Sequence, residues 1–185
     1  GGAYVTKMPL LHRTFLHILA KESKAQYLMV DYRLAPEFPF PAALADALTS
    51  YKWLLNQGWN PEQVLVAGDS AGGGLTAALL LALRDLELPL PAGAFLLSPW
   101  TDLTGSGDSI VSLAKEDFML DWDNLQECAR DYAGGESLVH PWVSPLFGNF
   151  HGIPDTLILA GGGEILLDDS VRLAERMKED GVNVE

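Results

Sequence analysis

A five-residue run, Gly-Asp-Ser-Ala-Gly at positions 68–72, constrains the fold of this chain more than any other feature of its sequence. The run follows a strand-like apolar segment at 64–67 and leads directly into the helix-forming segment 75–81. A G-x-S-x-G turn between a strand and a helix holds its serine in a tight, strained conformation, and glycines flank it because a Cβ would collide with neighbouring backbone. The pattern predicts a nucleophile elbow that exposes Ser70 at the top of a sheet.

Apolar runs and helical periodicities alternate along the rest of the chain. Continuous apolar runs, typical of strands buried on both faces, occupy 27–30, 64–67, 94–97 and 156–160. Apolar residues recur at helical spacing within 11–18, 44–55, 75–81 and 167–177. This alternation predicts an α/β fold with a mainly parallel sheet flanked by helices.

The composition narrows the class of protein. With 48% apolar and 20% charged residues, a chain of 185 residues can form one domain with a substantial core. The formal charge of −13 arises from 25 acidic and 12 basic residues, and there is no Lys/Arg cluster, so we expect no nucleic-acid partner. The one cysteine, Cys128, can form neither an internal disulfide nor a Cys-rich metal site, and we expect an ordinary core thiol.

The sequence shows no sign of targeting or of a stable membrane anchor. Its longest apolar stretch, 75–83, is too short to span a bilayer, and the N-terminus has no basic segment leading into a hydrophobic one. The compartment stays open on this basis, with the cytoplasm favoured, and so does the oligomeric state. The sequence opens at Gly1 without a methionine and stops inside a strand-like run at 182–185, so we expect a fragment truncated at both ends.

The interval from Trp100 to Pro154 is far longer than an ordinary connection, and long insertions of this kind are usually functional. It carries six large apolar side chains among acidic residues: Phe118, Met119, Trp122, Trp142, Phe147 and Phe150. We expect that part of it forms a helical lid element and contributes an apolar wall to a pocket. The alternative is that these side chains only anchor the loop to the core.

A serine hydroxyl is a poor nucleophile, so Ser70 needs a base to take its proton and donors to stabilise an oxyanion. The Ala71 N–H lies at the start of the predicted helix, where unpaired donors and the helix dipole both favour negative charge. Further donors can come from the small residues Gly1, Gly2 and Ala3, whose backbone can approach a substrate closely. We therefore expect an oxyanion hole that includes Gly2, Ala3 and Ala71.

Four ordered blocks carry a family resemblance. They are Gly-Gly-Ala-Tyr at 1–4, Asp-Tyr-Arg-Leu-Ala-Pro-Glu at 31–37, Pro-Phe-Pro-Ala-Ala at 39–43 and Gly-Asp-Ser-Ala-Gly-Gly at 68–73. In this order and at these separations, the chain resembles the hormone-sensitive-lipase family of α/β-hydrolase carboxylesterases, also described as α/β-hydrolase fold-3 proteins, from Gly1 to about Gly181. The resemblance implies a single partial α/β-hydrolase domain over 1–185, with a lid-containing insertion at 101–154.

The same resemblance implies site roles. Ser70 would be the nucleophile, and the loop at Gly1, Gly2 and Ala3 would form the oxyanion hole with Ala71. In α/β-hydrolases the acid follows the serine, at the end of a later strand. Glu164 has that place, after the apolar run 156–160 and three glycines, although the family usually has Asp-Pro-Leu where this chain has Glu-Ile-Leu.

Two neighbouring carboxylates are rivals for the role of the acid. Asp168 and Asp169 follow Glu164 closely, but on the predicted helix we expect them to cap it or to favour its positive end. Further upstream, Arg33 and Glu37 could help to shape the site, but we expect them to form a local ion pair in a proline-rich turn. Two more carboxylates, Asp46 and Asp102, are also expected to be structural.

The catalytic base is missing from the sequence. The family's histidine follows the acid, whereas all four histidines precede Glu164: His12, His17, His140 and His151. We expect the base to lie beyond Glu185. No nucleotide cofactor is expected, because the glycine-rich runs form neither a P-loop nor a complete G-x-G-x-x-G, and no metal is expected, because the histidines lack H-E-x-x-H spacing.

These observations favour a serine carboxylesterase or lipase-like hydrolase that acts on a small-molecule ester through an acyl-enzyme intermediate. One alternative is a non-catalytic small-molecule receptor on the same scaffold, since the plant gibberellin receptors resemble this family, keep the serine and lose the histidine. Another is hydrolysis of an amide or a lactone, because an elbow and an oxyanion hole serve acyl transfer generally. The acyl chain length and the alcohol cannot be read from these motifs.

Overall fold

Three parallel strands form the sheet of this protein, seen in a computed structural model that describes residues 1–7 and 9–185. The strands are β1 (Leu65–Asp69), β2 (Gly93–Leu97) and β3 (Thr156–Leu159), in the order β1-β2-β3. Leu65 pairs with Gly93, and Ala94 pairs with Thr156, so the three carboxyl ends lie at one edge. Val184 forms a parallel bridge to Thr156, as expected of a strand that begins beside β3.

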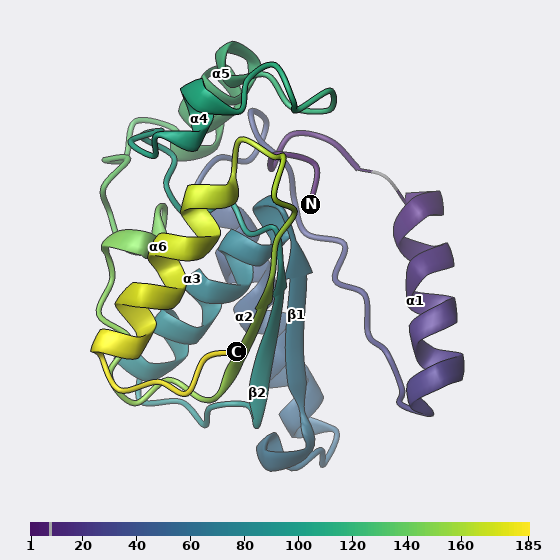
Figure 1. The fold of residues 1–185 in the computed structure, drawn as a ribbon. Helices are drawn as coiled ribbons and strands as arrows, with labels where there is room; N and C mark the ends of the chain where they lie inside the picture. Colours follow the sequence, from purple (N-terminus) through teal and green to yellow (C-terminus); the bar gives the residue numbers. More distant parts are fainter. Residues whose placement is uncertain (8) are drawn as a thin grey trace.

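Six α-helices surround this sheet in the described part of the chain. Their bounds are α1 (Pro9–Ser23), α2 (Ala42–Asn56), α3 (Ala71–Asp85), α4 (Ser109–Ser112), α5 (Trp122–Ala133) and α6 (Leu167–Glu179), with 3₁₀ turns η1 (Pro61–Gln63) and η2 (Pro145–Phe147). Figure 1 shows α2, α3 and α6 on one face of the sheet, α1 on the other, and α4 and α5 above the carboxyl ends of the strands. The predicted α/β fold is confirmed, and the four predicted helices are present.

The core is centred on α3. Every residue of this helix from Ala71 to Leu83 is buried, as expected of a helix that is apolar all round. On one side it packs with α2 around Leu44 and Tyr51. On the other side Leu80 and Leu81 belong to a cluster with Phe150 and residues of α6. The helix that follows the elbow is therefore held rigidly, and with it the turn at Ser70.

The expectation of a buried strand at 27–30 is wrong. These residues run from the end of α1 back toward the sheet (Figure 1) without pairing to another described strand, and the Leu28 side chain is 52% exposed. An apolar run becomes a strand only where a neighbouring backbone accepts its hydrogen bonds. Among the described residues, no strand lies beside this run to do so.

The insertion at 101–154 contains α4, α5 and η2, and its apolar side chains divide into two groups. Phe150 is fully buried and Trp142 and Trp122 pack against the core, as the anchoring alternative expected. Phe118 and Met119 are 99% and 80% exposed. Helix α5 is well delimited, since the Asp121 carboxylate accepts the Asn124 N–H at 3.1 Å and Gly134 ends the helix with φ +60°. No helix in the described ranges is both long and apolar enough to cross a membrane.

Candidate active site

Ser70 lies between β1 and α3 in a strained backbone conformation, with φ 52° and ψ −123°. Hydrogen bonds fix this turn on both sides. The Ser70 N–H donates to the Leu97 carbonyl at 2.9 Å, and the Ser70 carbonyl accepts the N–H groups of Gly74 at 3.1 Å and Trp100 at 3.0 Å. The hydroxyl makes no capping bond to α3. The serine is therefore held in place by its backbone while its side chain stays half-buried and free for chemistry.

The glycines around Ser70 are required by close backbone approach. A Cβ at Gly68 would collide with the carbonyl of Gly72, and a Cβ at Gly72 would come within 2.9 Å of the Gly1 nitrogen. A heavy-atom approach under 3.0 Å to backbone demands a shift of one of the two segments. The absence of a side chain at Gly72 thus lets the N-terminal loop pack against the start of α3.

The residues predicted to form the oxyanion hole lie together at this place. Gly2, Ala3 and Tyr4 have φ values of +86°, +50° and +65°, so the backbone turns sharply beside the elbow. The Tyr4 ring is buried and stacks on Tyr132 with centroids 3.7 Å apart, which anchors the turn. Within residues 1–7 and 9–185, the N–H groups of Gly2, Ala3 and Ala71 donate to no other group. Three backbone donors are therefore available to a ligand at the elbow.

Gly1 is held by a side chain that the sequence did not indicate. The Tyr32 hydroxyl donates to the Gly1 carbonyl at 3.1 Å. Burial, together with the nearby charge of Asp69, raises the pKa of Tyr32 to about 12. The phenol therefore stays protonated at neutral pH and remains a donor to this carbonyl.

Glu164 lies in the loop between β3 and α6, which Figure 1 shows at the carboxyl ends of the strands. Its carboxylate accepts the Gly161 N–H at 2.9 Å. Ser70 follows β1 and Glu164 follows β3, with β2 between them, so the two loops start about 10 Å apart by the spacing of neighbouring strands. That separation can accommodate one imidazole ring between a hydroxyl and a carboxylate.

The two rival carboxylates have other partners. Asp168 accepts the Ser109 N–H at 2.9 Å, and Asp169 accepts the N–H groups of Thr101 and Asp102 at 2.7 Å each. Neither side chain caps α6, but both lie in its first turn, so of the two expected roles only the place at the positive end of the helix is confirmed. Burial raises the pKa of Asp169 to about 7, against the hydrogen bonds it accepts. Their partners are about 60 residues away in sequence, and nothing in the local pattern indicated them.

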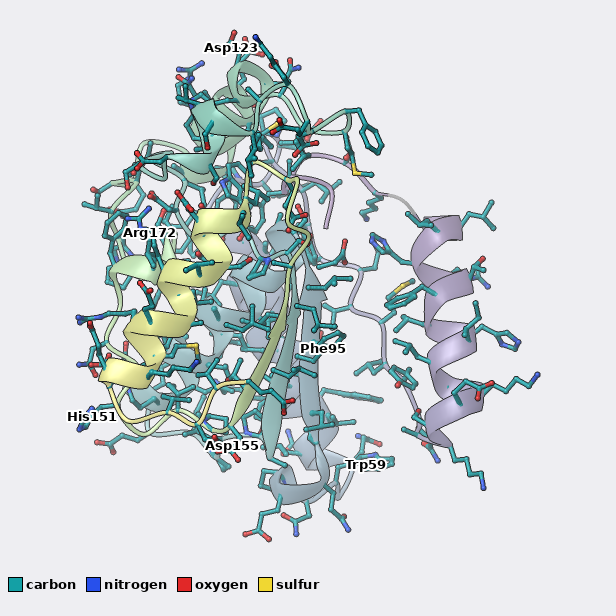
Figure 2. The ribbon with its side chains drawn as sticks, viewed as in Figure 1. Trp59, Phe95, Asp123, His151, Asp155 and Arg172 are labelled. Carbon is teal, nitrogen blue, oxygen red and sulfur yellow. The ribbon has the colours of Figure 1, made fainter. Side chains whose placement is uncertain are left out.

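Each of the described histidines contacts another group or is exposed. His12 on α1 contacts Asp69, with Nε2 3.2 Å from Oδ2, and His17 is exposed on the same helix. The Nδ1 atom of His140 accepts the Trp142 N–H at 3.1 Å. His151 lies at the same end of the molecule as Asp155 and opposite the end that carries Asp123 (Figure 2).

The predicted ion pair between Arg33 and Glu37 is also wrong, because Arg33 pairs with Asp46 instead. The guanidinium donates from Nη2 to Oδ1 at 2.8 Å, and the Arg33 backbone N–H donates to Oδ2 at 2.9 Å. These hydrogen bonds hold the pKa of Asp46 below its usual range. Asp102, in contrast, is structural as expected: it is fully buried and accepts hydrogen bonds from Thr104 and Ser106.

The insertion lines a small hollow of about 130 Å³ between α4, the start of α5 and Ile165. None of its lining residues comes from the elbow or from residues 1–4. This hollow is therefore not the pocket beside Ser70 for which the sequence predicted an apolar wall. The exposed Phe118 and Met119 do not line it.

Comparison with known proteins agrees with this geometry. The sequence profile of the alpha/beta hydrolase fold family matches residues 1–185. An acetyl-hydrolase of Streptomyces hygroscopicus is 41% identical over 184 residues, covering 100% of this chain and 62% of that protein. An esterase of Acinetobacter venetianus is 38% identical over 185 residues, covering 100% of this chain and 61% of that protein.

A solved structure of an esterase from the bacterial hormone-sensitive lipase family is similar as well. It superposes with a TM-score of 0.98 at 41% identity and covers 100% of this chain and 62% of its own. The chain thus spans about three fifths of the length of the relatives it matches.

Proposed function

Because this chain belongs to the alpha/beta hydrolase fold family, with the strained serine and free backbone donors described above, we propose that the complete protein is a serine hydrolase of small carboxylic esters. Relatives named acetyl-hydrolase and esterase support this reaction class. The observation that carries the proposal is the placement of Ser70 at φ 52° beside three N–H groups that have no acceptor among the described residues.

In this proposal Ser70 is the nucleophile. Its Oγ attacks the ester carbonyl carbon while an imidazole takes the hydroxyl proton, which gives a tetrahedral oxyanion. The N–H groups of Gly2, Ala3 and Ala71 stabilise that charge, since preorganised donors act most strongly where charge develops. The intermediate collapses to an acyl-serine, and the alcohol leaves with the proton from the imidazolium. Water then attacks the acyl-serine by the same route and releases the acid.

Glu164 orients the imidazole and stabilises its positive charge. This role is supported by its place after β3, across β2 from the elbow, and by the engagement of Asp168 and Asp169 with other partners. The imidazole comes from a histidine beyond Glu185, because the described histidines are held elsewhere. Chain segments beyond this region complete the base and the substrate pocket.

The test uses the complete protein, a fluorophosphonate probe and p-nitrophenyl acetate, a short ester suggested by the acetyl-hydrolase relative. Ser70→Ala should abolish labelling and lower kcat at least about a thousand-fold, because a triad serine has no substitute. The matched control is Ser98→Ala, since Ser98 also has positive φ, 44°, directly after the neighbouring strand β2.

Glu164→Gln leaves Ser70 in place but should lower kcat by about ten-thousand-fold, the loss typical of a triad acid replaced by its amide. If the folded complete protein shows neither labelling nor turnover, the hydrolase proposal fails and the receptor alternative takes its place. Labelling of Ser98 in place of Ser70 would assign the nucleophile elsewhere.

A further inference from the structure

A carboxylate of the insertion, Asp117, contacts the residue that follows Glu164. Its Oδ2 accepts the Ile165 N–H at 2.9 Å. Its other oxygen, Oδ1, accepts the N–H groups of Met119 at 2.9 Å and Leu120 at 2.8 Å. One carboxylate thus orders its own loop and holds the backbone beside the proposed acid, 48 residues away in sequence.

This contact fixes the orientation of the peptide group between Glu164 and Ile165. The N–H of that group donates to Asp117, and its carbonyl oxygen, on Glu164, accepts the Leu167 N–H at 3.1 Å. A planar peptide held at both polar atoms leaves its residue little freedom in ψ. The Glu164 side chain therefore starts from a fixed backbone.

Ser109 holds the next peptide group of the same loop. Its Oγ donates to the Ile165 carbonyl at 2.7 Å, and the Ile165 side chain is buried. Both polar backbone groups of Ile165 are thus bound by the insertion, Asp117 on one side and Ser109 on the other. The loop that carries the proposed acid is fastened to the insertion as well as to its own sheet.

The charge state of Asp117 suits this role. Burial opposes its ionised form, but the N–H groups of Ile165, Leu120 and Met119 outweigh that effect and hold its pKa below the usual range. At neutral pH the side chain is therefore an acceptor on both oxygens. An amide at this position could accept on one oxygen only.

We propose that Asp117 is a positioning residue for ester hydrolysis, which fixes the Glu164 carboxylate relative to Ser70 by holding the Ile165 N–H. The role rests on the proposed function, because it acts through the proposed acid. It also couples that acid to the insertion, since the exposed Phe118 and Met119 directly follow Asp117 in the loop it orders.

The test compares Asp117→Asn with Asp121→Asn in the complete protein. The amide introduced by Asp117→Asn can keep its oxygen on the N–H groups of Met119 and Leu120, which places an NH₂ donor against the Ile165 N–H. Asp121 is the matched control, because it caps α5 from the same loop, asparagine caps a helix equally well, and the same negative charge is removed.

Asp117→Asn should lower kcat for p-nitrophenyl acetate roughly ten- to a hundred-fold, the range for a catalytic group that is misplaced by about 1 Å, with KM nearly unchanged. The acidic limb of kcat/KM should move to lower pH, because the imidazole loses part of its anionic partner. Asp121→Asn should change neither quantity by more than about two-fold. Amide exchange at Ile165 should speed up in Asp117→Asn alone.

A double-mutant cycle separates positioning from a general loss of structure. In a Glu164→Gln background, Asp117→Asn should lower kcat no further, because the group through which it acts has already been neutralised. Equal multiplicative losses in both backgrounds, or a loss no larger than that of Asp121→Asn, would overturn the positioning role while leaving the hydrolase proposal intact. An unsubstituted protein that neither labels nor turns over would overturn both.

Discussion

The Asp169 carboxylate at the start of α6 accepts a hydrogen bond of 2.7 Å from the backbone N–H of Thr101. The adjoining Trp100 N–H donates to the Ser70 carbonyl at 3.0 Å. One short segment after β2 therefore connects the helix that follows Glu164 with the turn that carries Ser70. Fixing this segment fixes the relative position of the proposed acid and the proposed nucleophile.

The buried Asp169 should make stability depend on pH. Its pKa in the folded protein, raised by burial to about 7, lies above the value of about 3.9 in an unfolded chain. Such a group contributes its stability fully below about pH 4 and loses it as the pH rises through about 7. The loss is on the order of 4 kcal/mol, since each unit of pKa difference corresponds to about 1.4 kcal/mol.

Asp169→Asn isolates this contribution, because asparagine is nearly isosteric and does not titrate. The free energy of unfolding of wild type minus that of Asp169→Asn should fall by about 4 kcal/mol as the pH is raised from about 4 to about 8, because only wild type loses stability over this range. Urea unfolding at several pH values measures it. If this quantity instead rises with pH, the folded protein holds Asp169 ionised.

Local sequence predicted the parts of the fold that depend on local chemistry. The strand, turn and helix around Ser70 follow from flanking glycines that admit close backbone approach and from an apolar helix that has to be buried. Gly1, Gly2 and Ala3 lie in a sharply turning loop beside the elbow, and their role as donors stays a prediction. These features depend on a few neighbouring residues, which is why a single sequence shows them.

Features that depend on distant partners were not predictable. The run at 27–30 has strand composition, yet it pairs with no described strand. Arg33 pairs with Asp46 on α2 although Glu37 is nearer in sequence, because Asp46 also accepts the Arg33 backbone N–H. Asp169 is of a residue type favoured at helix starts, but its carboxylate accepts a hydrogen bond from Thr101, 68 residues away in sequence. Each of these contacts depends on tertiary packing, which local secondary-structure propensity does not predict.

The backbone strain at Ser70 should be measurable as a difference in free energy of unfolding between two variants at this position. A non-glycine residue at φ 52° and ψ −123° costs about 1–3 kcal/mol, and glycine adopts such angles freely. Glycine also makes the unfolded chain more flexible, which offsets about 0.5–1 kcal/mol of the gain. Ser70→Gly should therefore be more stable than Ser70→Ala by about 1 kcal/mol in urea unfolding. Both variants lack the hydroxyl, so equal stabilities would show that the elbow holds no strain.

Removing Ser106 should lower the free energy of unfolding more than removing Arg172, although both side chains hydrogen-bond to the buried Asp102. Ser106 Oγ donates to Asp102 at 2.6 Å and accepts from Arg172 at 3.0 Å, so Ser106→Ala removes two hydrogen bonds. We expect a loss of about 1.5–3 kcal/mol for a bond to a buried charge. Arg172→Met should cost about 1 kcal/mol or less, because the guanidinium is partly exposed and Asp102 keeps its donors from Thr104 and Ser106.

The pH dependence of Ser106→Ala provides the check on this interpretation. Burial opposes ionisation of Asp102, but the hydrogen bonds from Ser106 and Thr104 outweigh it and hold its pKa below the usual range. A carboxyl of lowered pKa contributes stability above its unfolded value of about 3.9 and loses it as the pH falls. The cost of Ser106→Ala should therefore be full at neutral pH and smaller in acid. A cost independent of pH would assign the effect to packing.

Gly74 should tolerate no side chain, although it lies inside a helix where alanine is normally favoured by about 1 kcal/mol. A Cβ at Gly74 would collide with the Trp100 carbonyl and come within 2.9 Å of the Tyr4 hydroxyl, and the first of these is backbone that cannot rotate away. We expect Gly74→Ala to destabilise the protein by about 3 kcal/mol or more. Gly162→Ala is the control, because a Cβ there would meet nothing within 4 Å. The folded fraction of Gly74→Ala should also react more slowly with a fluorophosphonate, since a displaced Trp100 no longer holds the Ser70 carbonyl. Melting temperatures that match between the two variants would show that α3 and the segment after β2 are not in close contact at this point.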